Sequence, residues 1–306
     1  METISIVIPI FGTIGLGYLS RRFNVIKQSA SSSFNRFVYF FALPFLILRG
    51  ILNLTPESLL DWRLIATNLL AMTVLMVISI FVSSKILHRD KKTVAMFAIA
   101  SYFGSVAYIG IPFNELAFGK TGGGIAVIIA VISILFAITI GLGTLKTVEQ
   151  KKQNSLIDIL QSVIQLPIIW ATILGLIIVF LNIPLPASAN SLMNSLAGLA
   201  GPLALFSLGM FVHENKVKGD FVSIFKLSIF SLLALPLVVF LIAKLFNLSG
   251  LPLQVSIIQA GMPIAVTNFV FSQKFKTEEE IISQAIVLTV LLSPITLSLL
   301  LWLVNK

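Results

Sequence analysis

Two stretches of this sequence combine a Gly-x-Pro motif with polar side chains inside apolar runs. Proline removes a backbone donor and clashes with the preceding helical turn, so each motif predicts a helix broken into two halves. The exposed amides and the helix dipole at such a break attract anions. We therefore predict a substrate site formed by Ser105, Gly110, Pro112, Asn114, Gln259, Gly261, Pro263, Thr267 and Asn268.

Two other interpretations of these residues stay open. A single Gly-x-Pro can simply kink a membrane helix, and a simple kink is also expected for each of these prolines taken alone: Pro9, Pro44, Pro167, Pro202 and Pro294. The asparagines can also serve only to hydrogen-bond neighbouring helices. The broken-helix interpretation is favoured because both motifs fall in equivalent positions of the chain with polar neighbours.

Glu115 follows the first motif by three residues and is the carboxylate expected nearest the break. An ionisable group inside the membrane is a functional hypothesis by default, so Glu115 is a possible coupling residue. Alternatively, it reaches the outer interface and is solvated there. No buried Lys or Arg is expected to pair with a carboxylate substrate.

Few residues are available for other chemistry. The chain has no cysteine and two histidines, His88 and His213, which fall at the ends of apolar runs. A thiol nucleophile, a Cys-type zinc site and a disulfide are excluded. An intramembrane enzyme would need a paired carboxylate, a Ser/His arrangement or a His-rich metal set at one depth, so we expect no enzyme activity, no metal site and no cofactor.

The composition requires a membrane environment. Of 306 residues, 57% are hydrophobic and 11% are charged, whereas a soluble chain is roughly a quarter charged. Apolar runs of about 16 to 26 residues recur throughout, and each is long enough to cross a bilayer as a helix. We predict an all-α polytopic membrane protein with spans at Ile4–Leu19, Phe34–Leu52, Leu64–Leu87, Val94–Phe118, Ile125–Leu145, Leu156–Leu181, Leu192–Val212, Phe221–Phe246, Leu253–Phe275 and Ile281–Val304.

The basic residues predict the orientation of these ten spans. Sixteen of the 21 Lys and Arg residues fall in the connections after the odd-numbered spans. Basic residues concentrate on the cytoplasmic side, so both termini should lie outside the cytoplasm. The net charge of +9 is explained by this topology, and no nucleic-acid partner is expected.

The chain also contains an internal repeat. A shift of about 158 residues aligns prolines, a glycine and an asparagine that are hard to match by chance. The aligned pairs are Pro9 with Pro167, Gly17 with Gly175, Asn24 with Asn182 and Pro44 with Pro202. Because each half has five spans, the halves, residues 1–150 and 151–306, are predicted to be inverted repeats whose broken fourth and ninth spans cross near the midplane.

The motifs around Pro112 and Pro263 resemble those of the auxin efflux carrier family, which includes plant auxin exporters and bacterial permeases for organic acids. The resemblance covers essentially the whole chain, although this sequence has Ser105 where the family usually has asparagine. It implies a scaffold domain of spans 1, 2, 6 and 7, a transport domain of spans 3–5 and 8–10, an elevator-like motion and a homodimer.

These observations predict a secondary transporter of a small organic anion or weak acid in the inner membrane of a bacterial cell. Its partners would be the substrate, membrane lipid and a second copy of the chain. A channel or a membrane-embedded sensor is the alternative that the sequence leaves open.

Overall fold

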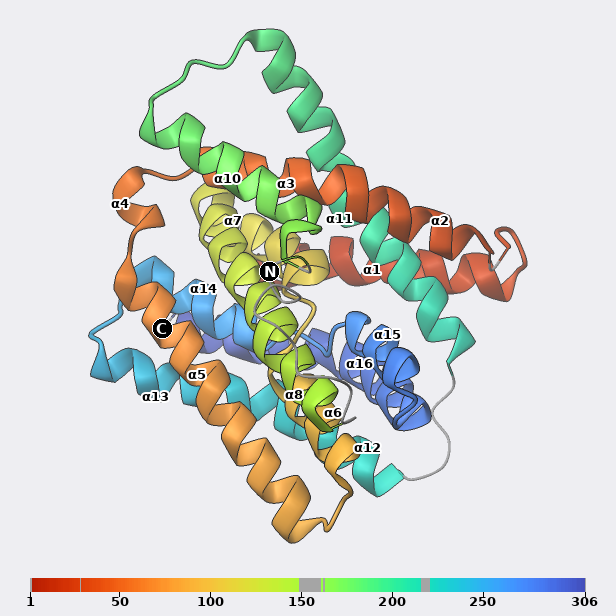
Figure 1. Ribbon diagram of the computed structural model, residues 1–306. Coiled ribbons are helices and arrows are strands. Elements are labelled where there is room, and N and C mark those ends of the chain that lie inside the picture. Colours follow the sequence, from red (N-terminus) through yellow and green to blue (C-terminus); the bar gives the residue numbers. More distant parts are fainter. Residues whose placement is uncertain (1, 28, 149–160, 162, 216–220, 306) are drawn as a thin grey trace. The chain divides into compact units, whose positions relative to one another are not determined.

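The computed structural model describes residues 2–27, 29–148, 161, 163–215 and 221–305. In these residues the regular structure is helical, with one isolated antiparallel bridge between Gly104 and Ile264 (Figure 1). The segments, with π-helical ones marked η, are α1 (Glu2–Arg22), α2 (Ser29–Phe37), η1 (Val38–Ala42), α3 (Leu43–Leu52), α4 (Pro56–Leu59), α5 (Trp62–Phe81), η2 (Val82–Ile86), α6 (Lys91–Tyr102), η3 (Val106–Gly110), α7 (Ile111–Phe136), η4 (Ala137–Gly141), α8 (Leu142–Val148), α10 (Pro167–Phe180), α11 (Ala187–Glu214), α12 (Phe221–Ile229), η5 (Phe230–Ala234), α13 (Leu235–Leu245), α14 (Gly250–Ala260), α15 (Thr267–Phe275) and α16 (Glu279–Val304).

The chain divides into two compact units, each assembled from three stretches of sequence. Unit 1 comprises Met1–Asp61, Ala107–Val131 and Leu166–Asn215. Unit 2 comprises Trp62–Val106, Ile132–Gln165 and Lys216–Lys306. Unit 1 therefore holds most of the sequence predicted as spans 1, 2, 6 and 7, together with a part of spans 4 and 5.

Two glycines allow close packing of α1 against α11 in unit 1. The same unit packs α3 against both α10 and α11. A Cβ atom added to Gly17 would overlap the backbone carbonyl of Phe206, and one added to Gly209 would overlap that of Ile14. Small residues let membrane helices approach backbone to backbone, which replaces the hydrophobic driving force that lipid does not provide.

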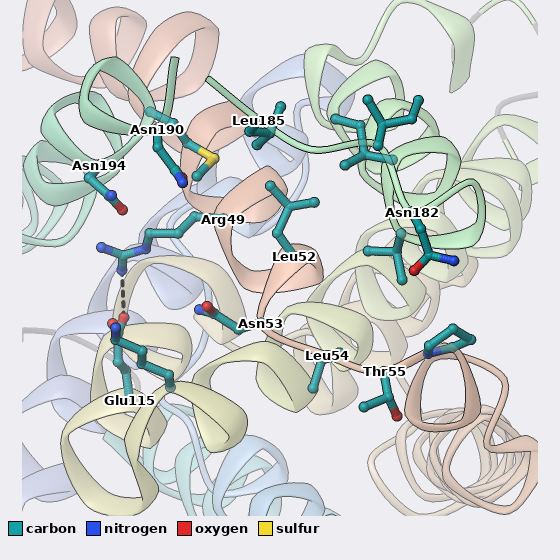
Figure 2. Close-up of a pocket in the computed structure, with 16 residues that line it drawn as sticks. Arg49, Leu52, Asn53, Leu54, Thr55, Glu115, Asn182, Leu185, Asn190 and Asn194 are labelled. Carbon is teal, nitrogen blue, oxygen red and sulfur yellow. Dashed lines mark hydrogen bonds and ion pairs between the residues drawn. The ribbon is translucent and has the colours of Figure 1, made fainter. Parts of the chain in front are cut away.

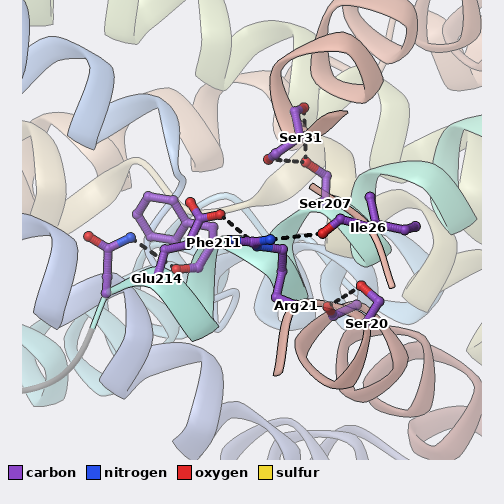
Figure 3. Close-up of polar contacts among 9 residues, drawn as sticks. Ser20, Arg21, Ile26, Ser31, Ser207, Phe211 and Glu214 are labelled. Atoms are coloured by element: carbon purple, nitrogen blue, oxygen red, sulfur yellow. Dashed lines mark hydrogen bonds and ion pairs between the residues drawn. The ribbon is translucent and has the colours of Figure 1, made fainter. Parts of the chain in front are cut away.

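Polar contacts near the end of α1 connect α11 to both α1 and α2 (Figure 3). The Arg21 guanidinium donates to the Glu214 carboxylate at 3.2 Å and to the Ile26 carbonyl at 2.8 Å. The hydroxyls of Ser31 and Ser207 are 3.2 Å apart. Arg21 is thus held by two partners.

Unit 2 is built around α5 and α16. Helix α5 packs against α6, α13 and α14, and α16 packs against α12, α14 and α15. Asp90 caps α6, because its carboxylate accepts the backbone N–H groups of Lys92 and Thr93 at 2.9 and 3.2 Å. The Thr93 hydroxyl also donates to Asp90 and holds the pKa of this carboxyl below its ordinary value.

Three of the π-helical segments precede a proline at the second position of the next helix. The segments η1, η3 and η5 are followed by helices that begin Leu43-Pro44, Ile111-Pro112 and Leu235-Pro236. A proline ring clashes with the carbonyl four residues earlier, and a π turn widens the helix at that point. These helices therefore continue through their prolines.

Six helices of the described residues are long and apolar enough to cross a membrane: Ser29–Leu52, Pro56–Ile86, Val106–Leu145, Ala187–Glu214, Phe221–Leu245 and Glu279–Val304. The shorter Pro167–Phe180 is also apolar. On α13 the side chains of Leu237, Leu241 and Leu245 are exposed at intervals of four residues, a stripe suited to lipid. A helical polytopic membrane protein is confirmed, whereas the count of ten spans stays a prediction.

The connection between the predicted spans 4 and 5 differs from the structure. The run Val106–Leu145 is helical apart from Gly119, whose φ of 71° and ψ of −169° change the chain direction inside α7. Positive φ is readily adopted only by glycine. A single non-helical residue therefore separates what the sequence predicted as two spans with a longer connection.

Candidate functional site

Two interrupted helices meet in unit 2 through their extended residues. Helix α6 ends at Tyr102 and α14 ends at Ala260, and the segments that follow pair through the isolated antiparallel bridge between Gly104 and Ile264. The Ser105 N–H donates to the Pro263 carbonyl at 2.7 Å, and the Ala265 N–H donates to the Phe103 carbonyl at 3.1 Å. We call Phe103–Val106 with Gly261–Val266 the crossing.

Buried amide side chains from both flanking helices brace the crossing. Gln259 donates through Nε2 to the Val106 carbonyl at 3.3 Å. Asn268 donates through Nδ2 to the carbonyls of Phe103 and Ala265 at 2.9 and 3.1 Å. Its Oδ1 atom is buried and accepts no hydrogen bond from the described residues, so a polar acceptor is left for a ligand or water.

Sequence reasoning missed two buried polar contacts of unit 2, those of Thr289 and Asn68. The Thr289 hydroxyl on α16 accepts the Ile264 N–H at 3.2 Å. Asn68 on α5 donates to the Ser256 hydroxyl at 3.0 Å, and all three of these side chains are buried. A polar residue within an apolar span was the available signal, but the sequence does not say which helix it faces.

The structure corrects the position of the first break. The sequence predicted it at Gly110–Pro112, yet η3 and α7 are helical there, and the extended residues lie at Phe103–Ser105 instead. Pro112 is tolerated because it follows a π turn. Gly104 marks the actual break, since a Cβ atom there would lie 3.0 Å from the Met262 carbonyl.

The crossing can bind charge without a charged side chain. Helices α6 and α14 end there with their C-terminal carbonyls, and η3 and α15 begin there with their N-terminal amides. Of these amides, the Asn268 and Phe269 N–H groups donate to the Ala265 and Val266 carbonyls at 2.9 Å. Amides at helix N-termini favour an anion, and carbonyls at C-termini favour a cation. Such a site suits a small polar solute that is recognised by hydrogen bonds.

The ten predicted site residues fall in both units. Unit 2 brings together Ser105, Gln259, Gly261, Pro263, Thr267 and Asn268 at the crossing. Unit 1 holds Gly110, Pro112, Asn114 and Glu115. Asn114 is buried and donates to the Gly110 carbonyl at 2.8 Å, so it braces the start of α7.

Glu115 lies in an open cavity of unit 1 with a volume of about 710 Å³, where its carboxylate accepts a 2.7 Å hydrogen bond from Arg49 (Figure 2). The side chains of Arg49 and Glu115 are 21% and 31% exposed, so Arg49 is a partly exposed basic group beside this carboxylate. That no buried Lys or Arg pairs with a carboxylate substrate stays a prediction. A coupling role for Glu115 would act through this ion pair. The Arg49 pocket is lined by Arg49, Leu52, Asn53, Leu54, Thr55, Pro56, Glu115, Lys120, Ile178, Val179, Asn182, Ile183, Leu185, Asn190, Met193 and Asn194.

Comparison with known proteins identifies the family. The family model described as membrane transport protein matches residues 3–302. The chain belongs to this membrane transport protein family, that of the auxin efflux carriers. As a family member with six long apolar helices among its described residues, it is an integral membrane protein.

The chain is also similar in sequence to several proteins named as transporters or efflux carriers. The chain is 24% identical to the uncharacterized transporter YfdV of Escherichia coli (strain K12), over 88% of this chain and 87% of the relative. It is 27% identical to a putative malonate transporter of Rhizobium meliloti (strain 1021), over 100% and 97%. A match of 28% identity to the probable auxin efflux carrier component 9 of Oryza sativa subsp. japonica covers 45% of this chain and 34% of the relative. These relatives are named as transporters rather than enzymes.

Proposed function

We propose that this membrane transport protein is a secondary transporter of a small organic anion or weak acid, and that the crossing in unit 2 holds the substrate. The observation that carries the proposal is the pair of antiparallel hydrogen bonds between Phe103–Ser105 and Pro263–Ala265, flanked by buried Gln259 and Asn268. Interrupted helices with free backbone groups are the usual substrate sites of secondary transporters.

The substrate class follows from the neutral amides and from one relative. Helix N-terminal N–H groups at Val106 and Thr267 suit a carboxylate. The relative from Rhizobium meliloti is named a putative malonate transporter, so malonate is a reasonable first probe. The side chains proposed to contact substrate in unit 2 are Ser105, Gln259, Thr267 and Asn268, with the backbone of Gly261 and Pro263.

For the transport cycle we propose an elevator-like motion of unit 2 relative to unit 1, in a homodimer assembled through unit 1. The inverted repeat, residues 1–150 and 151–306, is proposed to supply alternating access. We further propose that both termini lie outside the cytoplasm and that the chain resides in a bacterial inner membrane. A reporter active only in the cytoplasm, fused after Lys306, should give no signal.

Counterflow in proteoliposomes distinguishes a carrier from a channel or sensor. Vesicles are loaded with unlabelled malonate, and the entry of labelled malonate is followed. A carrier should show saturable entry that internal malonate accelerates, because loaded sites return faster than empty ones. Unsaturable entry without acceleration would support a channel, and no entry of any small carboxylate would support a sensor.

A further inference from the structure

We propose that the Arg49 pocket is a second binding site for small carboxylates. In the absence of ligand Arg49 pairs with Glu115, and a ligand carboxylate replaces Glu115 as the partner of Arg49. The site lies in unit 1, whereas the proposed substrate site is the crossing in unit 2. Nothing in the proposal requires that the crossing binds substrate.

Arg49 is only partly satisfied by Glu115. A guanidinium carries five N–H donors in a planar fork, and it binds carboxylates most strongly through two parallel hydrogen bonds. Within the described residues Arg49 makes one hydrogen bond, from Nη2 to Oε2 of Glu115. An incoming carboxylate can therefore make a second bond that Glu115 does not make.

The cavity carries the charge and the size for such a ligand. Arg49 and Lys120 contribute two positive charges to its lining and Glu115 contributes one negative charge. A volume of about 710 Å³ lies in the range of small-molecule sites and leaves room for a small carboxylate together with water.

Neutral polar groups complete the lining. Figure 2 shows Asn53, Asn190 and Asn194 around the ion pair. Their amides both donate and accept, so they can bind the second end of a dicarboxylate or its water shell. Leucine and isoleucine side chains form the apolar wall that would face a short hydrocarbon body.

A second ion pair among the described residues of unit 1 is a natural control. Arg21 donates to Glu214 and also to the Ile26 carbonyl, so its guanidinium is held by two protein partners (Figure 3). Neither Arg21 nor Glu214 lines the Arg49 pocket. A purely structural ion pair should resemble Arg21–Glu214, whereas Arg49–Glu115 stands in an open cavity.

The pocket is also positioned for ligands from one side of the membrane. Its lining comes from the end of α3 with the following loop, the first turns of α7, the end of α10 and the start of α11. The connections involved follow the even-numbered predicted spans, which the basic residues assign to the outer side. The proposed ligand would therefore enter from outside the cytoplasm.

The test is malonate binding by calorimetry to the purified full-length protein, in an Asn268→Ala background that weakens the crossing site. Glu115→Gln should tighten binding about three- to tenfold, because it removes the competitor for Arg49 while keeping the side-chain shape. Arg49→Gln should abolish detectable binding, and Arg49→Lys should give an intermediate affinity because the fork is lost. Malonamide, the neutral analogue, should not bind.

Arg21→Gln and Glu214→Gln are the matched controls and should leave affinity unchanged. If Glu115→Gln weakens binding, or if Arg49→Gln leaves it intact in protein with an unaltered melting curve, the inference is overturned. Counterflow by Arg49→Gln protein tests the proposed function separately. Retained counterflow with lost pocket binding would support both proposals, and pocket binding in a protein that transports nothing would leave only the pocket.

Discussion

The crossing in unit 2 and the Arg49 pocket in unit 1 use opposite means to attract a carboxylate. The crossing is made of backbone groups and the buried amides of Gln259 and Asn268, with no net charge on those side chains. The Arg49 pocket is open and contains an ion pair whose two side chains are 21% and 31% exposed. The first is pre-organised by tertiary hydrogen bonds, and the second by two charges that can exchange partners.

This difference suits the proposed elevator-like motion, in which the crossing moves through the membrane and the Arg49 pocket does not. A neutral site carries no unpaired charge through the bilayer when it is empty, whereas an exposed arginine would cost several kcal/mol at the centre of the membrane. Arg49 lies in the last turn of α3, and its side chain is 21% exposed. The two sites should therefore respond differently to substitution.

The largest effect is expected from removing the amide that spans the crossing. Asn268→Ala deletes the donor to the Phe103 and Ala265 carbonyls and should lower malonate counterflow at least tenfold. Asn215→Ala removes a similar amide bond, to the Phe211 carbonyl at the end of α11, and should leave counterflow near wild type. Equal losses of counterflow in both variants would contradict a specific role of Asn268 in the crossing.

Substitution of Pro263, in the crossing, and of Pro112, at the start of α7, should affect malonate binding to different extents. Pro263→Ala restores a donor and helix propensity within the extended segment, so it should strongly reduce malonate binding. Pro112→Ala falls within a continuous helix and should have a much smaller effect. Binding measured on both purified variants checks the order, and the reverse order would return the break to the predicted Gly110–Pro112.

Unit 1 should be less tolerant of added volume at its helix contact than at its surface. Gly17→Ala and Gly209→Ala force Cβ atoms onto backbone carbonyls, and each should destabilise the protein by about 1–3 kcal/mol. Gly12→Ala on the same helix meets nothing within 4 Å and should be neutral or stabilising. Thermal unfolding in detergent measures all three, and a similar loss for Gly12→Ala would exclude the packing explanation.

The smallest expected effect concerns the cap of α6, the helix that leads into the crossing. Asp90→Ala should cost about 1 kcal/mol of stability at neutral pH. The pKa of Asp90 is lower in the folded protein than its ordinary value of 3.8, so its contribution is present above that value and is lost as the pH falls below it. Melting temperatures of wild type and variant should therefore converge below about pH 4, and a constant difference would contradict this role.

The sequence predicted local features well. The apolar runs gave helices, and the aligned residues Asn24 and Asn182 both adopt positive φ, 54° and 51°, two residues after the ends of α1 and α10. Asparagine favours this conformation after a helix, so the two aligned asparagines mark equivalent backbone conformations in the two halves of the chain. Gly119 likewise ends the predicted fourth span at a positive φ.

Contacts between distant residues were beyond such reasoning. Glu115 and Arg49 are 66 positions apart, and the position of Arg49 near the end of the predicted span Phe34–Leu52 does not reveal its partner. The break at Phe103–Ser105 has no proline, because it is fixed by pairing with Pro263–Ala265 rather than by its own sequence. Thr289 contributes a single hydroxyl from α16, and an apolar helix pattern does not reveal that contact.

The most direct test of the crossing as substrate site is protection of an engineered thiol. The native chain has no cysteine, so Thr267→Cys, at the exposed start of α15, introduces a single reactive group in proteoliposomes. We expect malonate to slow its reaction with a charged thiol reagent, malonamide to have no effect, and Ser32→Cys on α2 to react at the same rate with or without malonate. Unchanged reactivity of the Thr267→Cys protein at a malonate concentration that saturates counterflow would contradict the assignment of the crossing as the substrate site.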